Sequence, residues 1–271
     1  MDLAAYLQRI GLGSGAGLAE LHRAHVTSIP FENLDSHQGL TVSLELGDLE
    51  RKLVTRRRGG YCFEHNLLFA AALDAIGLQT EPMLARVRLG RPPGTPRPRT
   101  HLVHRVHTGD GVWLADVGFG NGTLLEPIPF GPGAEHEQSG WRFRIVTDGR
   151  EHVLQTIEGS DWVDVYGFEP EPVPFVDIET SNWFTCTHPR SPFRAGLIVA
   201  VNHPDGTRVA MSDWNGLSLT TRTSRQRTVS EPAREDIPQL LETEFGLGGF
   251  ALGDDGRVTE RTAGGPRRRN P

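Results

Sequence analysis

Cys62 is the residue of this sequence whose type and position most clearly suggest a chemical role. It lies in the segment RRRGGYCFEHN, residues 56–66, and Cys186 is the other cysteine of the chain. The adjacent Gly59 and Gly60 predict a tight turn into a helix, which puts Cys62 in or beside the first helical turn. There the unpaired N–H groups and the positive end of the helix dipole favour the thiolate, the nucleophilic form of cysteine. The three arginines add positive charge, although such a run is more often a solvated face. The alternative is a small buried apolar residue, the usual role of a free cysteine.

A metal site is a second possible use of these residues. Cys62 and His65, three apart on a helix, could share one ligand sphere, and His101, His104 and His107 follow later in the chain. Residues three apart on a strand point to opposite faces, so the three later histidines cannot converge on one ion. The sequence also contains no CxxC pair and no HExxH motif. We therefore predict that the chain binds no metal.

The segment 100–119 predicts a β-hairpin that would supply a base and a carboxylate. It reads THLVHRVHTGDGVWLADVGF, two runs of strand-forming residues joined at TGDG, which is a turn signal. With a two-residue loop, Thr108 pairs with Gly111. The same register puts His101 opposite Gly118.

This register makes His101 and Asp116 diagonal neighbours on one face of the sheet, roughly 7–8 Å apart. His104 points to the other face, and His107 is a weaker candidate partner for Asp116. An aspartate inside the apolar run VWLADVGF is costly to bury unless it is paired. We therefore predict a Cys62–His101–Asp116 triad. The alternative is an ordinary His–Asp hydrogen bond within a sheet.

The elements that must position these residues come in the order helices first, strands second. Periodicity and capping residues predict helices at 2–12, 18–31, 47–57 and 62–77. After Pro82, short segments rich in β-branched and aromatic residues predict antiparallel strands at 83–89, 101–108, 112–119, 141–148, 151–157 and 161–169. From about 190, further strands at 196–203, 207–213 and 217–222 precede a helix at 232–247. This order predicts an α+β fold rather than an alternating α/β fold.

Composition excludes several classes of function. The 271 residues carry a formal net charge of −6 and give a pI of about 6.0, so no global basic field is present to hold nucleic acid. Two distant cysteines form no disulfide framework and favour a reducing compartment. The N-terminus lacks a secretory signal pattern, and the longest apolar stretch, residues 67–73, is far too short to cross a membrane. We predict a cytoplasmic protein without nucleic-acid or membrane partners.

The motifs around these residues resemble those of the arylamine N-acetyltransferases. The resemblance rests on RGGYCFEHN around Cys62, THLVHRV around His101 and WLADVGFG around Asp116. It extends in order along the chain, from about residue 3 to 248, through YLQRIGL, LHRAHVTSIPFENLD, SNWFTCTHPRSPF and LLETEFGL.

The resemblance implies a three-part architecture with a cysteine-proteinase-like catalytic core. A helical bundle, residues 1–82, would carry the cysteine. An antiparallel β-barrel, residues 83–189, would carry the histidine and aspartate. An α/β lid, residues 190–252, would close over the cleft. We expect the remaining polar, glycine-rich stretch, residues 253–271, to be disordered.

The resemblance also implies a ping-pong reaction in xenobiotic metabolism, with acetyl-CoA as co-substrate and no tightly bound cofactor. Cys62 would take the acetyl group and pass it to an arylamine, an aryl hydrazine or an N-hydroxyarylamine, with His101 as base and Asp116 orienting it. Four residues fall where family members line the acceptor pocket: Phe31, Val87, Phe119 and Phe193. The loop GFGNGT would face the CoA diphosphate through the backbone of Gly118, Gly120, Asn121 and Gly122.

Two departures and two rival functions stand beside this hypothesis. Cys186 lies where the family usually has serine, and the proline-rich segment 90–99 lies next to His101, which puts the acyl-donor and amine preferences in doubt. One rival is an amide synthase that passes a larger acyl chain to an aryl amine. The other is a transglutaminase- or protease-like amide hydrolase, which would leave the SIPFENL and HPRSPF motifs unexplained.

Overall fold

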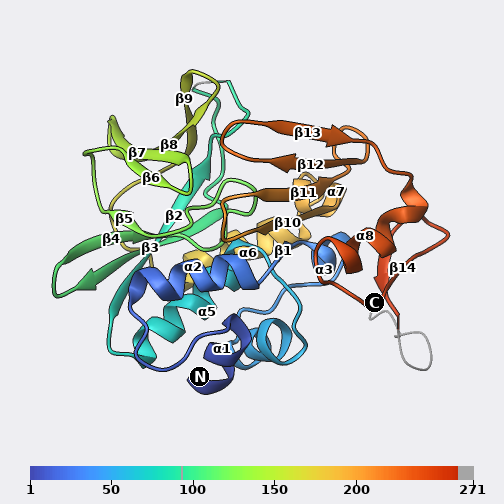
Figure 1. Ribbon diagram of the computed structural model, residues 1–271, viewed down its shortest axis with the longest axis horizontal. Coiled ribbons are helices and arrows are strands. Elements are labelled where there is room, and N and C mark those ends of the chain that lie inside the picture. Colours follow the sequence, from blue (N-terminus) through green and yellow to red (C-terminus); the bar gives the residue numbers. More distant parts are fainter. Residues whose placement is uncertain (93, 262–271) are drawn as a thin grey trace.

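The computed structural model describes residues 1–92 and 94–261. Helices of the N-terminal part lie along one side of the molecule, below two antiparallel sheets that lie next to each other (Figure 1). The predicted α+β class is confirmed. The N-terminal elements are α1 (Leu3–Ile10), α2 (Leu18–Ser28), β1 (Phe31–Glu32), α3 (Leu34–His37), α4 (Leu46–Leu49), the π-helix η1 (Glu50–Thr55) and α5 (Cys62–Ala75).

The larger sheet has eight antiparallel strands in the order β5-β4-β3-β2-β9-β8-β7-β6 and curves into a barrel-like shape (Figure 1). The predicted hairpin register is confirmed, because Thr108 pairs with Gly111 and His104 with Ala115. Its strands are β2 (Gln79–Val87), β3 (His101–Thr108), β4 (Gly111–Ala115), β5 (Ile128–Pro129), β6 (His136–Gln138), β7 (Trp141–Asp148), β8 (Glu151–Glu158) and β9 (Asp161–Phe168).

The second sheet has five antiparallel strands in the order β1-β10-β11-β12-β13, so the short N-terminal strand β1 joins a sheet made otherwise by the C-terminal part. None of the helices in the described residues has the length and apolarity that a membrane crossing needs. The C-terminal elements are α6 (Phe175–Thr187), α7 (Pro192–Ala195), β10 (Ile198–Asn202), β11 (Arg208–Ser212), β12 (Ser218–Arg222), β13 (Arg227–Ser230), the 3₁₀ helix η2 (Arg234–Asp236) and α8 (Ile237–Thr243).

A short hairpin replaces part of the stretch that we expected to be disordered. Strand β14 (Phe250–Leu252) pairs with β15 (Val258–Glu260). The turn between them forms because Gly256 adopts a positive φ of 73° and Asp255 accepts a hydrogen bond from the Arg257 amide at 3.1 Å. Residues 262–271 of that stretch lie outside the described residues.

Local sequence accounts for helix α5, which carries Cys62. Three consecutive alanines and flanking leucines favour the helix, and the Glu64 side chain accepts a hydrogen bond from the Tyr61 amide at 3.0 Å at its start. At its end Gly77 has a φ of 84° and donates to Asp74, while the Leu78 amide donates to Leu73. This is the Schellman arrangement that a glycine in this position predicts.

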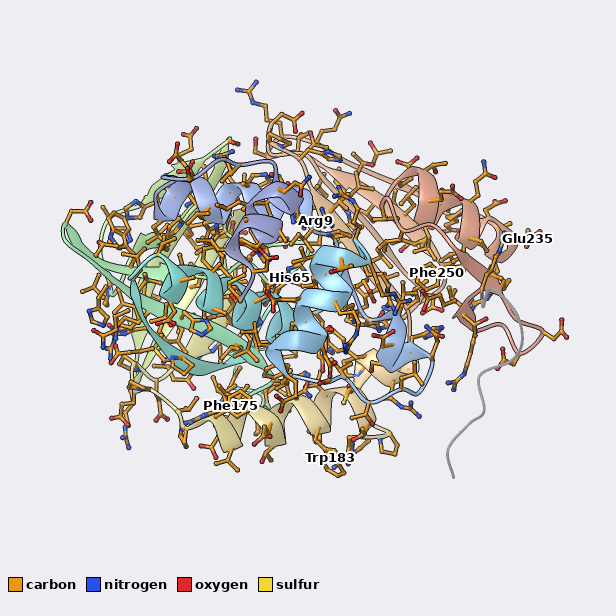
Figure 2. The ribbon with its side chains drawn as sticks, turned by 90° about the horizontal axis from the view of Figure 1, so that it is seen from below. Arg9, His65, Phe175, Trp183, Glu235 and Phe250 are labelled. Atoms are coloured by element: carbon orange, nitrogen blue, oxygen red, sulfur yellow. The ribbon has the colours of Figure 1, made fainter. Side chains whose placement is uncertain are left out.

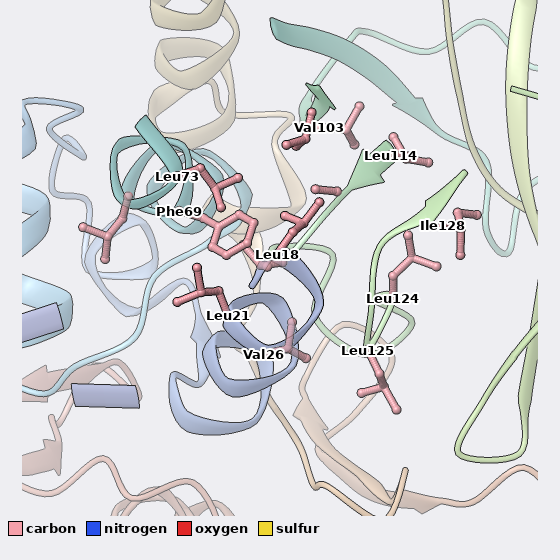
Figure 3. Packing of buried hydrophobic residues seen from close by; sticks show 14 of the residues in the cluster. Leu18, Leu21, Val26, Phe69, Leu73, Val103, Leu114, Leu124, Leu125 and Ile128 are labelled. Carbon is pink, nitrogen blue, oxygen red and sulfur yellow. The ribbon is translucent and has the colours of Figure 1, made fainter. Parts of the chain in front are cut away.

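The main hydrophobic core lies between α5, α2 and the eight-stranded sheet. Figure 3 shows Phe69 of α5 between side chains of α2 and of the sheet, and Phe69 is completely buried. A second core, around Met211 and Leu241, packs α8 against the five-stranded sheet. The helix that carries Cys62 is therefore fixed on the sheet that carries His101.

The glycine pair before α5 serves close packing, and not the tight turn that we predicted. Neither Gly59 nor Gly60 has a positive φ. A Cβ atom on Gly59 would lie 2.0 Å from the carbonyl oxygen of Pro30, because the two chain segments run side by side, with the Glu32 amide donating to Gly60 at 2.7 Å. Glycine is required there for the approach of one backbone to another.

We predict that Gly59→Ala destabilises the protein by more than ~2 kcal/mol, because the backbone of Pro30 must move to admit the methyl group. Gly47→Ala is the matched control, since nothing lies within 4 Å of a Cβ at that helical position. Urea unfolding followed by circular dichroism measures both variants. Equal midpoints for Gly59→Ala and wild type would contradict the packing argument.

Candidate functional site

Cys62 is the first residue of α5, with Tyr61 as its N-cap. It is 3% exposed, and its Sγ lies 3.5 Å from the carbonyl oxygen of Thr100, the residue before β3. This places the thiol at the positive end of a 14-residue helix. The predicted position at the helix start is confirmed.

His101 begins strand β3 and is paired with Asp116 just after the end of β4. Its Nε2 lies 2.7 Å from Asp116 Oδ2, and both side chains are buried. The strand pairing stops at Ala115, so Asp116 leaves the ladder and reaches His101 from the following turn. Among the described residues the other ring nitrogen, Nδ1, makes no hydrogen bond, and the proximity of Cys62 contributes to the raised pKa of His101.

The Asp116 carboxylate accepts further hydrogen bonds from two groups on its other oxygen. Asn66 Nδ2 lies 3.1 Å and the Gly118 amide 2.9 Å from Oδ1. Asn66 also accepts from the Val117 amide at 3.1 Å, so it ties α5 to the turn after β4. The sequence interpretation missed Asn66, although its position four residues after Cys62 puts both on one helical face.

Two other groups near Asp116 gave no signal in the sequence. His22 of α2 accepts a hydrogen bond from the Asp116 amide at its Nε2, at 3.2 Å. The Tyr166 ring of β9 lies 4.9 Å from the His101 ring, and its buried hydroxyl has no hydrogen-bond partner among the described residues. Burial, and then the charge of Asp116, raise the pKa of Tyr166 well above its ordinary value.

Burial and pairing act in opposite directions on the charges of this site. Burial lowers the pKa of His101, but the charge and hydrogen bond of Asp116, with a contribution from Cys62, raise it to about 10. Burial raises the pKa of Asp116, but the charge and hydrogen bond of His101 and the donors on its other oxygen lower it overall. The pair is therefore an imidazolium and a carboxylate at neutral pH.

Of the three arginines before Cys62, Arg56 and Arg58 are paired with carboxylates. Arg58 is buried and pairs with Glu32 at 2.6 Å and Asp35 at 2.8 Å. Lys52 joins the same cluster, with its Nζ 2.8 Å from Asp35 and 2.7 Å from Glu64. These ion pairs anchor the segment that enters α5, and their charges are largely compensated locally.

The other histidines considered as ligands or bases point elsewhere. His65 bonds to His25 at 2.9 Å and to the Pro30 carbonyl at 3.2 Å. His107 lies 2.8 Å from Glu81. His104 is buried on the face of the hairpin opposite to His101. Burial lowers the pKa of both His65 and His104 to about 4. Within the described residues no group of three or more potential ligands is placed to hold a metal ion.

Three of the four predicted acceptor residues contribute aromatic rings around the cysteine and histidine. The Phe119 ring lies 5.0 Å from that of His101, edge to face, and Phe31 lies 6.1 Å from Phe193 in the hydrophobic cluster that includes Cys62. Val87 is half-buried and pairs with Tyr166 across β2 and β9, so it shares the sheet face of that ring.

The loop from Gly118 to Gly122 has two of its amides already engaged. Gly118 donates to Asp116, and Gly122 donates to the Gly120 carbonyl at 2.9 Å. A Cβ on Gly118 would lie 2.8 Å from Cys62 Cα, so this glycine lets the loop pack against the start of α5. Among the described residues no hydrogen bond is donated by the amides of Phe119, Gly120 and Asn121.

Comparison with known proteins gives a consistent result. A family model described as N-acetyltransferase matches residues 16–249. An arylamine N-acetyltransferase of Mycolicibacterium smegmatis is 39% identical over 264 residues, covering 94% of each chain. An arylamine N-acetyltransferase / N-hydroxyarylamine O-acetyltransferase of Salmonella typhimurium is 35% identical, covering 90% of this chain and 86% of the relative. The solved structure of a Mycobacterium marinum arylamine N-acetyltransferase in complex with CoA superposes with a TM-score of 0.86 at 32% identity, covering 91% of this chain and 93% of that one.

We predict that the His101 imidazolium keeps its proton through neutral pH and releases it near pH 10. In Asp116→Asn the counter-charge is gone while burial remains, so the pKa should fall below its ordinary ~6.5. NMR of ¹⁵N-histidine-labelled protein measures both, with histidines remote from Asp116 as internal controls. The same His101 midpoint in both proteins would contradict the pairing.

The raised pKa of His101 also makes the stability of the folded protein depend on pH. Because the pKa of His101 is raised on folding, the pair stabilises the protein fully below the unfolded pKa of ~6.5. That stabilisation should fade as the pH rises towards about 10, and the fading should be absent in Asp116→Asn.

Proposed function

This chain belongs to the arylamine N-acetyltransferase family, and on that premise we propose that it moves an acetyl group from acetyl-CoA to an arylamine or aryl hydrazine through a thioester on Cys62. The observation that carries the proposal is the buried grouping of Cys62 at a helix start, His101 and Asp116. Two facts support the choice of substrates. The relatives are named arylamine N-acetyltransferases, and one of them was solved in complex with CoA.

The first half-reaction would form the acetyl-cysteine. In the resting enzyme the thiol proton of Cys62 would already lie on His101 Nδ1, and Asp116 stabilises this imidazolium beside the thiolate. The thiolate attacks the thioester carbonyl, the carbon–sulfur bond to CoA breaks, and the leaving thiolate takes the proton from His101. N–H groups in the first turn of α5 lack intrahelical partners and would stabilise the developing oxyanion.

The second half-reaction would release the acetyl group to the amine. The amine nitrogen attacks the acetyl carbon, the bond to Cys62 Sγ breaks, and His101 accepts the proton that the amine loses. Asp116 holds the ring in place through Nε2 in both half-reactions. The other nitrogen, Nδ1, therefore serves as acid and base in turn.

A flat aromatic acceptor would lie against the rings of Phe31, Phe119 and Phe193, with Val87 at the margin. Such a molecule has few polar groups, so apolar walls must supply most of its binding energy. The backbone of Gly120 and Asn121 would face the diphosphate of the donor. In this proposal residues 1–82 supply the nucleophile, 83–189 the base and its carboxylate, and 190–252 cover the donor loop.

We predict that wild-type protein incubated with acetyl-CoA alone gains one acetyl group on Cys62, detected by intact mass and peptide mapping, and loses it when an aryl hydrazine is added. Cys62→Ala should gain none. Cys186→Ser is the matched control and should behave as wild type, because Cys186 is buried in α6 and its Sγ lies 3.8 Å from the Trp183 carbonyl of the same helix. Equal loss in both variants, or no adduct in wild type, would reject the thioester mechanism and favour an amide hydrolase.

We also predict that Phe193→Ala raises the KM for an arylamine by about tenfold or more, because the ring lost is apolar acceptor surface. Acetylation of Cys62 in a single turnover without amine should be unchanged. Phe175→Ala is the control, since Phe175, at the start of α6, is 48% exposed (Figure 2). Identical KM values for the two variants would remove Phe193 from the acceptor site.

A further inference from the structure

Three arginines lie directly opposite one another on neighbouring strands of the five-stranded sheet. Arg208 of β11 pairs with Arg222 of β12, and Arg222 pairs with Arg227 of β13. Like charges in directly opposite positions destabilise a sheet. We call Arg208, Arg222 and Arg227 the arginine row.

The arginine row lies on the sheet face that looks towards the proposed catalytic cysteine. Strand alternation puts Arg208 on the same face as Ala210, and Ala200 and Ala210 both belong to the cluster around Cys62. Ala200 pairs with Phe31, one of the proposed acceptor residues. The row is therefore two residues along the strands from the acceptor wall.

The inner end of the row contacts the proposed donor loop. Arg208 donates to the Thr123 carbonyl at 2.9 Å. Asn202, which pairs with Arg208 across β10 and β11, donates to the Gly120 carbonyl at 3.4 Å. Side chains of the five-stranded sheet thus hold both ends of the segment 120–123.

Arg208 is a buried cation without an acidic partner in the described part of the chain. It is 2% exposed, its guanidinium carbon lies 3.9 Å from the centre of the Trp141 ring, and no carboxylate lies within ion-pair distance. Burial and the charge of Arg222 lower its pKa to about 9. An uncompensated charge in this position is costly, which is expected where it serves a function.

Unsatisfied polar atoms gather around the same loop. Among the described residues, Arg208 Nε, Asn202 Oδ1 and Asn121 Oδ1 are buried and have no hydrogen-bond partner. The row then becomes more exposed outwards, from Arg208 to the half-buried Arg222 and the exposed Arg227, which flank the β12–β13 turn (Figure 1). Glu158, 2.9 Å from Arg222, is the counter-charge that contacts it.

We propose that the arginine row is the anion-binding track of the donor site, which receives the diphosphate and phosphate groups of the acyl donor between the loop 118–123 and the β12–β13 turn. This inference rests on the proposed function, because it takes the donor to be a phosphorylated thioester. Arg222 and Arg227 would contact the phosphates. Arg208 acts from below the loop by its charge and by holding Thr123.

The test compares a charged and an uncharged acyl donor, acetyl-CoA and p-nitrophenyl acetate, in wild type, Arg222→Gln, Arg227→Gln and the double variant. We expect each single variant to raise the KM for acetyl-CoA by about three- to fivefold, and the double variant by about tenfold or more, with kcat and p-nitrophenyl acetate turnover unchanged. Added salt should raise the wild-type KM for acetyl-CoA more than that of the double variant. Arg51→Gln, an exposed arginine of the helical part, controls for the loss of one charge.

Direct binding of CoA, measured by calorimetry, separates this inference from the proposed function. If CoA binding weakens in the double variant while wild-type protein is never acetylated on Cys62, the arginine row is supported and the thioester mechanism is rejected. An unchanged CoA affinity and an unchanged KM for acetyl-CoA would overturn the row. Equal losses with both donors would also overturn it, because they indicate a structural role of Arg222, whose guanidinium carbon lies 5.5 Å from the centre of the Trp141 ring.

Discussion

The buried charge of Asp116 is the interaction on which the rest of the site depends. A carboxylate without contact with solvent is tolerated only when its oxygens are fully engaged. Its partners come from three places: His101 at the start of β3, Asn66 on α5 and the Gly118 amide in the following loop. Satisfying one carboxylate therefore fixes helix, sheet and loop relative to one another, and it sets the protonation state of the histidine that faces Cys62.

Close backbone contacts made possible by glycine complete this arrangement. Gly118 lies against the backbone of Cys62, and Gly59 lies against Pro30, the residue before the strand that carries Phe31. Any side chain at either position would move the thiol relative to its partners. The glycines of these motifs thus act mainly through the space they leave, and their conformational freedom is secondary at both positions.

Buried cations are stabilised in two different ways in this molecule, by ion pairs near α5 and by an aromatic ring in the five-stranded sheet. Near α5, Lys52 and Arg58 are matched by three carboxylates, Glu32, Asp35 and Glu64, and form a closed cluster. In the five-stranded sheet Arg208 is stacked on Trp141 and has no such partner. The first arrangement holds an element in place, whereas the second leaves positive charge beside the loop between β4 and β5, which the five-stranded sheet contacts.

The sequence by itself determined the features that depend on neighbouring residues. Capping residues and alanines predicted α5 with Cys62 at its start, and the TGDG turn set the register that pairs His101 with Asp116. Tertiary structure alone decided which distant groups complete the site. His22 and Tyr166 lie far from Asp116 in the chain, the arginine row depends on the pairing of three strands, and the role of Gly59 depends on a segment that packs beside it. Local patterns carry propensity and register, but contacts between distant segments are set by how the layers pack, which no short pattern encodes.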